Sequence, residues 1–221
     1  MDETTKTKKL WTDLEWSILT GKGIDIGCGP DPVTKDVRRF DIDDGDANHI
    51  TQYVKEDFDF VFASHSLEHM HDPREAILEW WKLVRVGGHL FIIVPDEDLY
   101  EQGAFPSRFN SDHKATFTVS KQKSWSPVSI NCLDLASSLP NGQLISLVLQ
   151  DQGYHRSLMK HGLREPNLFV RHAVKLYTGV KKRTNISFSA LEYLRDQYTT
   201  IDQTRLPDAV AQIQFIVKKV A

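Results

Sequence analysis

The sequence is poor in cysteine and has no long apolar run. Its two cysteines in 221 residues, Cys28 and Cys132, are too few for a disulfide framework and lack the paired spacing of a structural zinc site. No apolar stretch approaches the roughly 20 residues that a membrane-spanning helix needs. The first residues, MDETTKTKKLWTDLEW, contain no apolar segment followed by a cleavage site. We therefore expect a cytoplasmic protein with no membrane association.

An excess of positive charge is also missing. Lysine and arginine total 27 against 30 aspartates and glutamates, which gives a net charge of -3. Proteins that bind nucleic-acid phosphates are usually basic, so we expect no nucleic-acid partner. The segment from Arg171 to Arg183 is locally basic and forms either a solvated helix face or a binding site for an anionic small molecule. The sequence leaves the oligomeric state open.

What the chain does contain is an alternation of strand-like and helix-like segments, which is typical of an α/β sheet. Its length is right for one domain with a substantial core, so we predict a single domain over residues 1–221. The segment 58–64 becomes apolar throughout, as a buried central strand does. The predicted strands are 23–27, 38–42, 45–50, 58–64, 89–95, 143–151 and 209–220.

The helices are marked by spacing and by capping residues. Apolar residues at helical spacing predict a helix over 10–19, and Asp72 followed by Pro73 predicts the start of another. Regularity then stops over 97–126, a loop long enough to suggest a function. We predict a further helix over 126–138, and two amphipathic helices within a helical insertion at 153–205 that forms the acceptor side.

Acidic residues and glycines follow the first predicted strands. Ligands of an open α/β sheet bind at the carboxyl ends of its strands, where these residues would meet. A dinucleotide fingerprint would need glycine at position 32, which is Pro32, so a nicotinamide cofactor is disfavoured. An acid two residues before the first glycine favours a ligand with an ammonium group, such as S-adenosylmethionine. Asp41 could accept the ribose hydroxyls of that ligand, and Asp46 the amine of its adenine.

Four motifs in order resemble the class I S-adenosylmethionine-dependent methyltransferases, in particular small bacterial ones associated with surface glycan or secondary metabolite pathways. They are DIGCGP at 25–30, FDIDDGDA at 40–47, FDFVFASHSLEHMHDP at 58–73 and LVRVGGHLFIIVPD at 83–96. The resemblance implies a Rossmann-like seven-stranded sheet of order 3-2-1-4-5-7-6, with the last strand antiparallel and helices on both faces. It also implies S-adenosylmethionine as the cofactor.

The same resemblance implies roles for particular residues. The loop of the first motif would surround the methionine part of the cofactor, Asp41 would bind its ribose, and Ile42 would lie against its adenine. Ser64 and His65 would line the cofactor near its sulfonium. The chain departs from the family pattern at the loop, where Asp31 stands in place of a third glycine, and before Asp46, where the segment is very short. The implied cofactor residues are Asp25, Gly27, Cys28, Gly29, Pro30, Asp41, Ile42, Asp46, Ala47, Ser64 and His65.

The acceptor of such an enzyme needs alignment with the methyl group and, if it is an alcohol, a proton acceptor. The candidate bases are His69, Asp96 and His113, and we favour His113 because it stands in the long loop. We expect the acceptor to be a sugar, a nucleotide-linked sugar or a related precursor, methylated on oxygen rather than nitrogen. A fold relative that binds the cofactor without catalysis is the alternative.

Two metal readings are weaker. The acidic run 96–98 could hold Mg²⁺ beside a substrate, but we favour a solvated loop. His65, Glu68 and His69 match the H-x-x-E-H signature of a zinc hydrolase, which requires both histidines on one continuous helix. Here His65 ends a predicted strand and the helix begins only at Asp72, so we expect the match to be accidental and assign no metal ligand.

Overall fold

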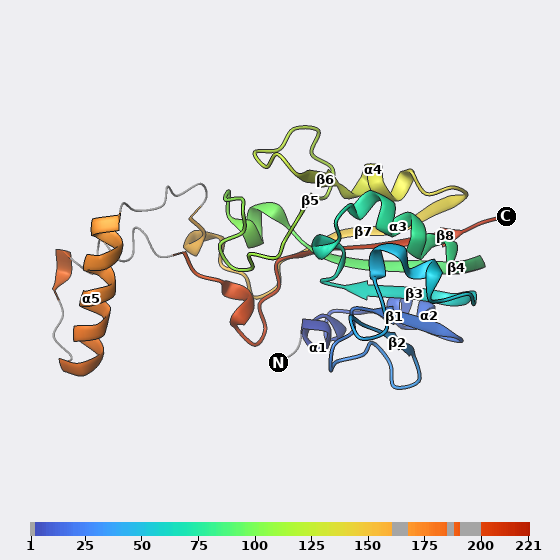
Figure 1. Ribbon diagram of the computed structural model, residues 1–221, viewed down its shortest axis with the longest axis horizontal. Helices are drawn as coiled ribbons and strands as arrows, with labels where there is room; N and C mark the ends of the chain where they lie inside the picture. Colours follow the sequence, from blue (N-terminus) through green and yellow to red (C-terminus); the bar gives the residue numbers. More distant parts are fainter. Residues whose placement is uncertain (1–2, 161–167, 185–187, 191–199) are drawn as a thin grey trace.

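The computed structural model describes residues 3–160, 168–184, 188–190 and 200–221. Its centre is a six-stranded sheet of order β2-β1-β3-β4-β8-β7 (Figure 1). The strands pair in parallel except β8, which is antiparallel to both β4 and β7. Their bounds are β1 Gly23–Ile26, β2 Arg38–Phe40, β3 Phe58–Ser64, β4 Val84–Pro95, β7 Gly142–Gln150 and β8 Gln212–Lys219.

The alternation of side chains along β3 fills a core on each face of the sheet. Val61 and Ala63 point into the larger core, and Phe60 and Phe62 point into the smaller one. The larger core is covered by α3 (Pro73–Lys82), α4 (Cys132–Ser137) and the 3-10 segment η1 (Ala47–Gln52). Residues of α2 (Asp13–Ile18) and of the loop after β1 close the smaller one. The prediction of helices on both faces is therefore confirmed.

The capping prediction for α3 is also confirmed. The Asp72 carboxylate accepts from the backbone N–H of Arg74 at 2.9 Å and of Glu75 at 3.2 Å, and Pro73 occupies the first turn. A short helix, α1 (Glu3–Lys8), precedes α2. The helix α5 (Leu168–Thr184) lies apart from the sheet in Figure 1. The second helix expected within 153–205 falls largely on residues outside the described ranges.

One predicted strand is wrong. Residues 45–50 do not add a seventh strand beyond β2, because residues 47–52 form η1 instead. The Asp46 carboxylate accepts from the N–H of Asn48 at 2.9 Å, and this local bond favours a turn over an extended chain. The order of the remaining strands agrees with the predicted order once that strand is removed.

The region 97–138 is more structured than predicted. It contains the π-helical turn η3 (Glu97–Glu101), and a two-stranded parallel sheet of β5 (Thr116–Thr118) and β6 (Ser129–Asn131). The helix predicted to start at 126 starts at Cys132, because residues 129–131 pair with β5 and Asn131 caps α4. Short 3-10 turns lie at η2 (Leu67–His69), η4 (Arg156–Leu158) and η5 (Gln203–Arg205).

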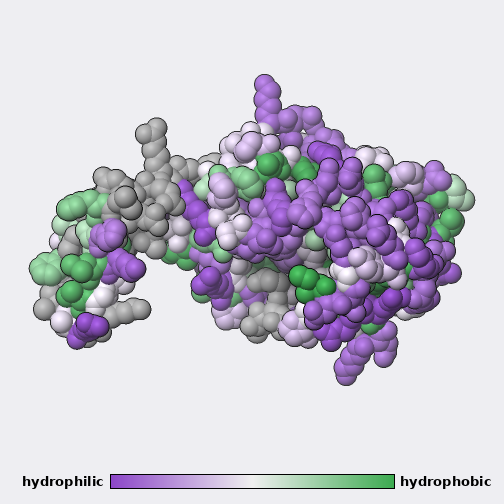
Figure 2. All heavy atoms as spheres, in the orientation of Figure 1, coloured by the Kyte–Doolittle hydropathy of each residue, from purple (hydrophilic) through white to green (hydrophobic). Residues whose placement is uncertain are grey.

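Within the described part of the chain, no helix combines the length and the apolar character needed to cross a membrane. On the face shown in Figure 2, hydrophilic residues cover most of the sheet body.

Candidate active site

A cavity of about 800 Å³ opens at the carboxyl ends of β1, β2 and β3. This is the edge at which an open α/β sheet binds its ligands. We call it the cofactor cavity. Six of the predicted cofactor residues line it: Gly27, Asp41, Ile42, Asp46, Ala47 and His65. Its other lining residues are Ile26, Phe40, Gly45, Asn48, Ser66, His69, Met70, His71, Asp112 and Lys114.

Gly27 turns the chain out of β1 in a conformation that favours glycine, with a φ of 73°. A Cβ at this position would lie 2.1 Å from the Ser66 hydroxyl oxygen. That hydroxyl donates to the carbonyl of Ile26 at 3.0 Å and so holds the end of β1 next to the end of β3. The close approach of the two strand ends requires a residue without a side chain here.

Asp41 ties the end of β2 to the glycine loop. Its Oδ2 accepts from the N–H of Gly29 at 2.7 Å, and its Oδ1 accepts from the N–H of Ile42 at 2.8 Å. A carboxylate can accept about four hydrogen bonds, so capacity remains for two ligand hydroxyls. The Ile42 side chain is 87% exposed beside the carboxylate. This arrangement suits a ribose and a flat apolar ring.

Asp46 is engaged with its neighbour. Its Oδ1 accepts from both the backbone N–H and the side-chain amide of Asn48, at 2.9 and 2.7 Å. These hydrogen bonds lower the pKa of the Asp46 carboxyl, which therefore stays ionised at the rim of the cavity.

Five predicted residues lie outside the cavity lining: Asp25, Cys28, Gly29, Pro30 and Ser64. The buried Asp25 accepts from the N–H of Val33 at 2.6 Å, and this hydrogen bond holds the loop after β1 against the strand. Burial raises the pKa of Asp25 to about 7. Burial also raises the pKa of the Cys28 thiol, which accepts from Arg39 Nε at 3.3 Å. Asp25 and Cys28 therefore support the loop from within the protein.

A second cavity, of about 240 Å³, shares His65 and His69 with the first. We call it the inner cavity. Both predicted catalytic residues line it, although His113 is 44 residues from His69 in the sequence. The ring centroids of these two histidines lie 5.0 Å apart. The full lining is His65, Glu68, His69, Tyr100, Asn110, His113, Thr204, Ala211 and Gln212.

Glu68 lies at the centre of this group and is fully buried. Its Oε1 is 3.4 Å from His65 Nδ1 and 4.0 Å from His113 Nε2. Burial acts to raise the pKa of Glu68, but the contact with His65 and the charges of the surrounding histidines outweigh it, so the pKa is lowered. The inner cavity therefore contains an ionised carboxylate.

Each predicted catalytic histidine contacts a second carboxylate through Nδ1. His113 Nδ1 lies 2.6 Å from Glu101 Oε1, and His69 Nδ1 lies 2.9 Å from Asp112 Oδ2. Each Nδ1 can donate to its carboxylate, and a ring with one proton in that place has its lone pair on Nε2. Sequence reasoning missed Glu101 and Asp112. Only the proximity of Asp112 to His113 in the sequence hinted at either.

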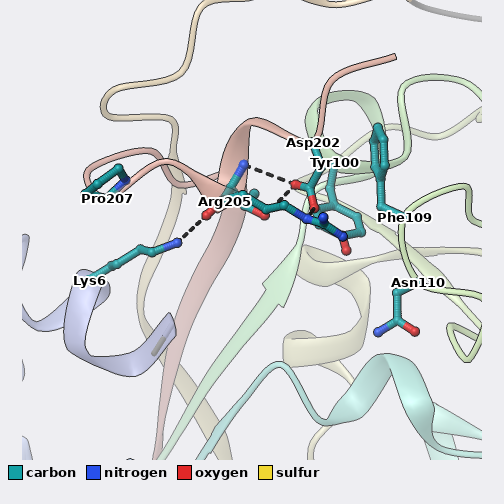
Figure 3. A pocket seen from close by; sticks show the side chains of 8 residues that line it. Lys6, Tyr100, Phe109, Asn110, Asp202, Arg205 and Pro207 are labelled. Atoms are coloured by element: carbon teal, nitrogen blue, oxygen red, sulfur yellow. Dashed lines mark hydrogen bonds and ion pairs between the residues drawn. The ribbon is translucent and has the colours of Figure 1, made fainter. Parts of the chain in front are cut away.

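The inner cavity continues into a third, of about 480 Å³, which shares Tyr100, Asn110 and Thr204 with it. Figure 3 shows its polar wall, in which Arg205 pairs with Asp202 and Lys6 donates to the carbonyl of Thr204. The expectation that the segment 153–205 contributes to the acceptor side remains a prediction, and Asp202, Thr204 and Arg205 do line this cavity.

The acidic run 96–98 is occupied by protein groups. Asp96 accepts from two N–H groups of η3, at 3.1 and 3.0 Å, and Asp98 pairs with Lys121. The buried Glu97 accepts from three hydroxyl groups, those of Thr116, Ser124 and Ser129. Asp96 and Glu97 are thus buried and bonded to protein groups, which corrects the expectation of a solvated loop. The structure does not contain the continuous helix of a zinc hydrolase: His65 has a φ of 53°, and only Leu67–His69 form a 3-10 turn.

Residues 31–92 match a family model described as a methyltransferase domain. They span the stretch from the loop after β1 to the middle of β4, including most of the cofactor cavity. This stretch of the chain therefore resembles a methyltransferase domain. The six-stranded sheet with its antiparallel β8 agrees with this assignment. The match to a methyltransferase domain supports S-adenosylmethionine as the cofactor. No curated protein matches the chain.

Three solved structures align with the chain at low identity. A protein from Bacillus halodurans C-125 assigned as a methyltransferase is 12% identical, with 99% of each chain covered and a TM-score of 0.49. An S-adenosylmethionine-dependent methyltransferase from Archaeoglobus fulgidus is 12% identical, covering 98% of this chain and 92% of that one, with a TM-score of 0.47. The third is phosphoethanolamine N-methyltransferase 2 of Haemonchus contortus, bound to phosphomonomethylethanolamine and S-adenosylhomocysteine. It is 15% identical, the alignment covers 95% of this chain and 53% of that one, and the TM-score is 0.47.

The residues present fit the cofactor. The Asp41 carboxylate lines the cavity beside an exposed apolar side chain, and the close packing at Gly27 shapes the turn where the methionine part would lie. His65 and His69 stand at the boundary with the inner cavity. The two cavities therefore adjoin at these two histidines.

Proposed function

We propose that the chain transfers the methyl group of S-adenosylmethionine to a hydroxyl oxygen of a small molecule, namely a sugar, a nucleotide-linked sugar or a related precursor. One observation carries this proposal. The cofactor cavity and the inner cavity share His65 and His69, so the inner cavity can hold an acceptor at the end of the cofactor. The bound cofactor supplies an electrophilic methyl group on a sulfonium.

The protein must align the acceptor and receive its proton. Asp41 and the glycine loop hold the cofactor from one side, and the histidine cluster faces the acceptor from the other. A hydroxyl is a poor nucleophile until it loses its proton, whereas a neutral amine is nucleophilic without that step. The gathering of His69 and His113 around Glu68 therefore favours oxygen over nitrogen as the methylated atom. We place the loss of the acceptor proton at this cluster.

The outer part of the acceptor site favours a polar molecule. Asn110 and Thr204 line both acceptor cavities, and Lys6 and Arg205 add positive charge to the third cavity (Figure 3). A polyhydroxylated molecule can bond to the amide and hydroxyl groups. An anionic substituent would be attracted by the two cations, although the pairing of Arg205 with Asp202 offsets part of that charge. The basic stretch on α5 contributes a further cavity, lined by His172, Lys175, Leu176, Gly179, Val180 and Arg183.

The proposal is tested in two stages. Calorimetry with S-adenosylhomocysteine and with NAD first measures whether the cofactor class binds, and we expect binding of the sulfur compound alone. Formation of S-adenosylhomocysteine is then measured with free sugars, sugar phosphates, nucleotide-linked sugars and matched amines. Turnover with a hydroxyl compound supports the proposal. Cofactor binding without turnover on any acceptor supports a non-catalytic relative, and turnover restricted to amines contradicts the oxygen assignment.

A further inference from the structure

The carboxylate of Glu68 is buried without a hydrogen-bond donor. Both of its oxygens, and Oε2 of Glu101, are enclosed and lack a hydrogen-bond partner among the described residues. Burial removes the water from this carboxylate, and in its place the described residues offer Oε1 only the longer contacts with His65 at 3.4 Å and His113 at 4.0 Å. Glu97 is equally buried but is bonded to three hydroxyl groups. The fold therefore satisfies one buried glutamate fully and leaves the other open toward the inner cavity.

Two histidines complete a set of metal-binding groups around Glu68. One ligand atom each from Glu68, His69 and His113 lie within 4.8 Å of one another. Ligands at about 2.0–2.2 Å from a shared ion are roughly 3–4 Å apart, so side-chain movements of about 1 Å would close the group on an ion. Glu68 and His113 are buried, and half-buried His69 lies on the boundary with the cofactor cavity.

The hydrogen bonds of His69 and His113 are also those of metal-binding histidines. A metal-binding histidine usually donates its other ring N–H to a carboxylate, which fixes the tautomer and the direction of the lone pair. Glu101 accepts from His113 in this way, and Asp112 accepts from His69. Nε2 of each ring is then the nitrogen available to an ion. Both histidines thus show the same outer hydrogen bond, and the Glu68 carboxylate beside them has, within the described part of the chain, only longer contacts with His65 and His113.

We propose that Glu68, His69 and His113 bind one divalent transition-metal ion, of the kind held by two histidines and one carboxylate, such as Zn²⁺, Fe²⁺, Co²⁺ or Mn²⁺. Two nitrogen ligands disfavour Mg²⁺ and Ca²⁺, which prefer oxygen. The site differs from the zinc-hydrolase reading, because His113 replaces His65, whose Nε2 contacts Gln212 at 3.1 Å. It revises the expectation that these histidines hold no metal.

The metal site deepens the proposed function and rests on it in one respect. Three protein ligands leave coordination positions open toward the inner cavity, where an acceptor hydroxyl can bind. An ion held there would lower the pKa of an acceptor hydroxyl, whose proton could then pass to solvent water. In this form His69 and His113 act on the acceptor through the ion that they hold, and Asp112 and Glu101 are positioning residues.

The binding experiment uses tag-free protein stripped with a chelator and titrated by calorimetry with Zn²⁺, Mn²⁺ and Mg²⁺ separately. We expect one Zn²⁺ ion per chain and much weaker binding of Mg²⁺. Asp112→Asn, at an exposed position, should weaken Zn²⁺ binding by about 10- to 100-fold. His69→Gln should weaken it further, while His89→Gln, which changes a histidine of β4 outside the cluster, should leave it unchanged.

Co²⁺ provides the spectroscopic test, since its visible absorption reports direct ligation. We expect a Co²⁺ spectrum in the parent protein that is altered in Asp112→Asn and lost in His69→Gln. Thermal unfolding of each variant shows whether it is folded. The absence of stoichiometric Zn²⁺ binding, or binding that His69→Gln leaves intact in a folded protein, overturns the metal proposal. S-adenosylhomocysteine binding is measured on the same samples, so a failure of the proposed function is seen separately.

Discussion

At the scale of single residues, the cofactor cavity is lined by residues that also hold the surrounding loops in place. Asp41 is bonded to two backbone N–H groups of its own fold and still presents a carboxylate to the cavity. Position 27 accommodates only glycine, because a Cβ there would overlap the side chain of Ser66. Substitutions at these positions therefore change both the loop geometry and the affinity for the cofactor.

Asp41→Ala should weaken binding of S-adenosylhomocysteine. Loss of charge-assisted hydrogen bonds to the ribose should cost about 1–3 kcal/mol, and calorimetry measures the change. The matched control is Asp43→Ala, two residues away and exposed. Equal affinities in the two variants would place the ribose elsewhere.

Gly27→Ala should destabilise the protein more than Gly29→Ala does. Both glycines have a positive φ, 73° and 51°, which costs a residue with a Cβ about 1–2 kcal/mol. Only the first would also place a Cβ against Ser66, since nothing lies within 4 Å of a Cβ at Gly29. The free energies of unfolding in urea, measured without cofactor, give the comparison. Equal losses would show that the contact with Ser66 relaxes easily.

At the scale of elements, the region 97–131 carries part of the acceptor site on structure of its own. Glu97 joins β5, β6 and the loop between them through its three hydroxyl donors. His113 lies between η3 and β5 and bonds to Glu101 at the end of η3. The position of the catalytic candidate therefore depends on how this region folds.

Glu97→Ala should loosen this region, because three hydroxyl groups lose their common acceptor in a buried place. We expect a loss of several kcal/mol, since each buried group left unsatisfied costs about 1–3 kcal/mol. Hydrogen exchange should rise in residues 97–131 more than in β3. Glu75→Ala, on the exposed side of α3, is the control. Exchange that rises uniformly would contradict a local role.

Prediction from the sequence succeeded where a pattern is local. Continuous apolar runs identified β3 and β4, and the convergence of parallel strand ends placed Asp41 and His65 at one cavity. The segment 45–50 failed because a side-chain bond from Asp46 outweighs a short run of strand-like residues. Glu101 and Asp112 could not be foreseen, because their contacts with the histidines depend on the folding of the long loop.

At the scale of the whole molecule, the balance of buried carboxyls makes stability depend on pH. Burial raises the pKa of Asp25 to about 7 and that of Asp96 to about 6. Each group binds a proton more tightly in the folded state than in the unfolded chain, where the value is near 3.8. The protonated forms of Asp25 and Asp96 therefore contribute fully to the free energy of unfolding below about pH 4. This contribution is lost as the pH rises through 6 to 7. Glu68 changes stability in the opposite direction, because its pKa is lowered in the folded state. Its contribution to the free energy of unfolding is lost when the pH falls below the ordinary pKa of a glutamate.

The free energy of unfolding without cofactor should consequently fall between pH 5 and pH 8, and Asp25→Asn should flatten that decline. A shift of about three pKa units corresponds to roughly 4 kcal/mol as an upper bound, so at pH 8 the variant should be the more stable protein. Its amide oxygen can still accept from the N–H of Val33, which keeps the loop in place. Urea unfolding across this pH range measures the slope, with Asp43→Asn as the exposed control. A parent protein whose stability is flat or rises from pH 5 to pH 8, or an Asp25→Asn variant with an unchanged slope, would show that Asp25 ionises in the folded state at little cost.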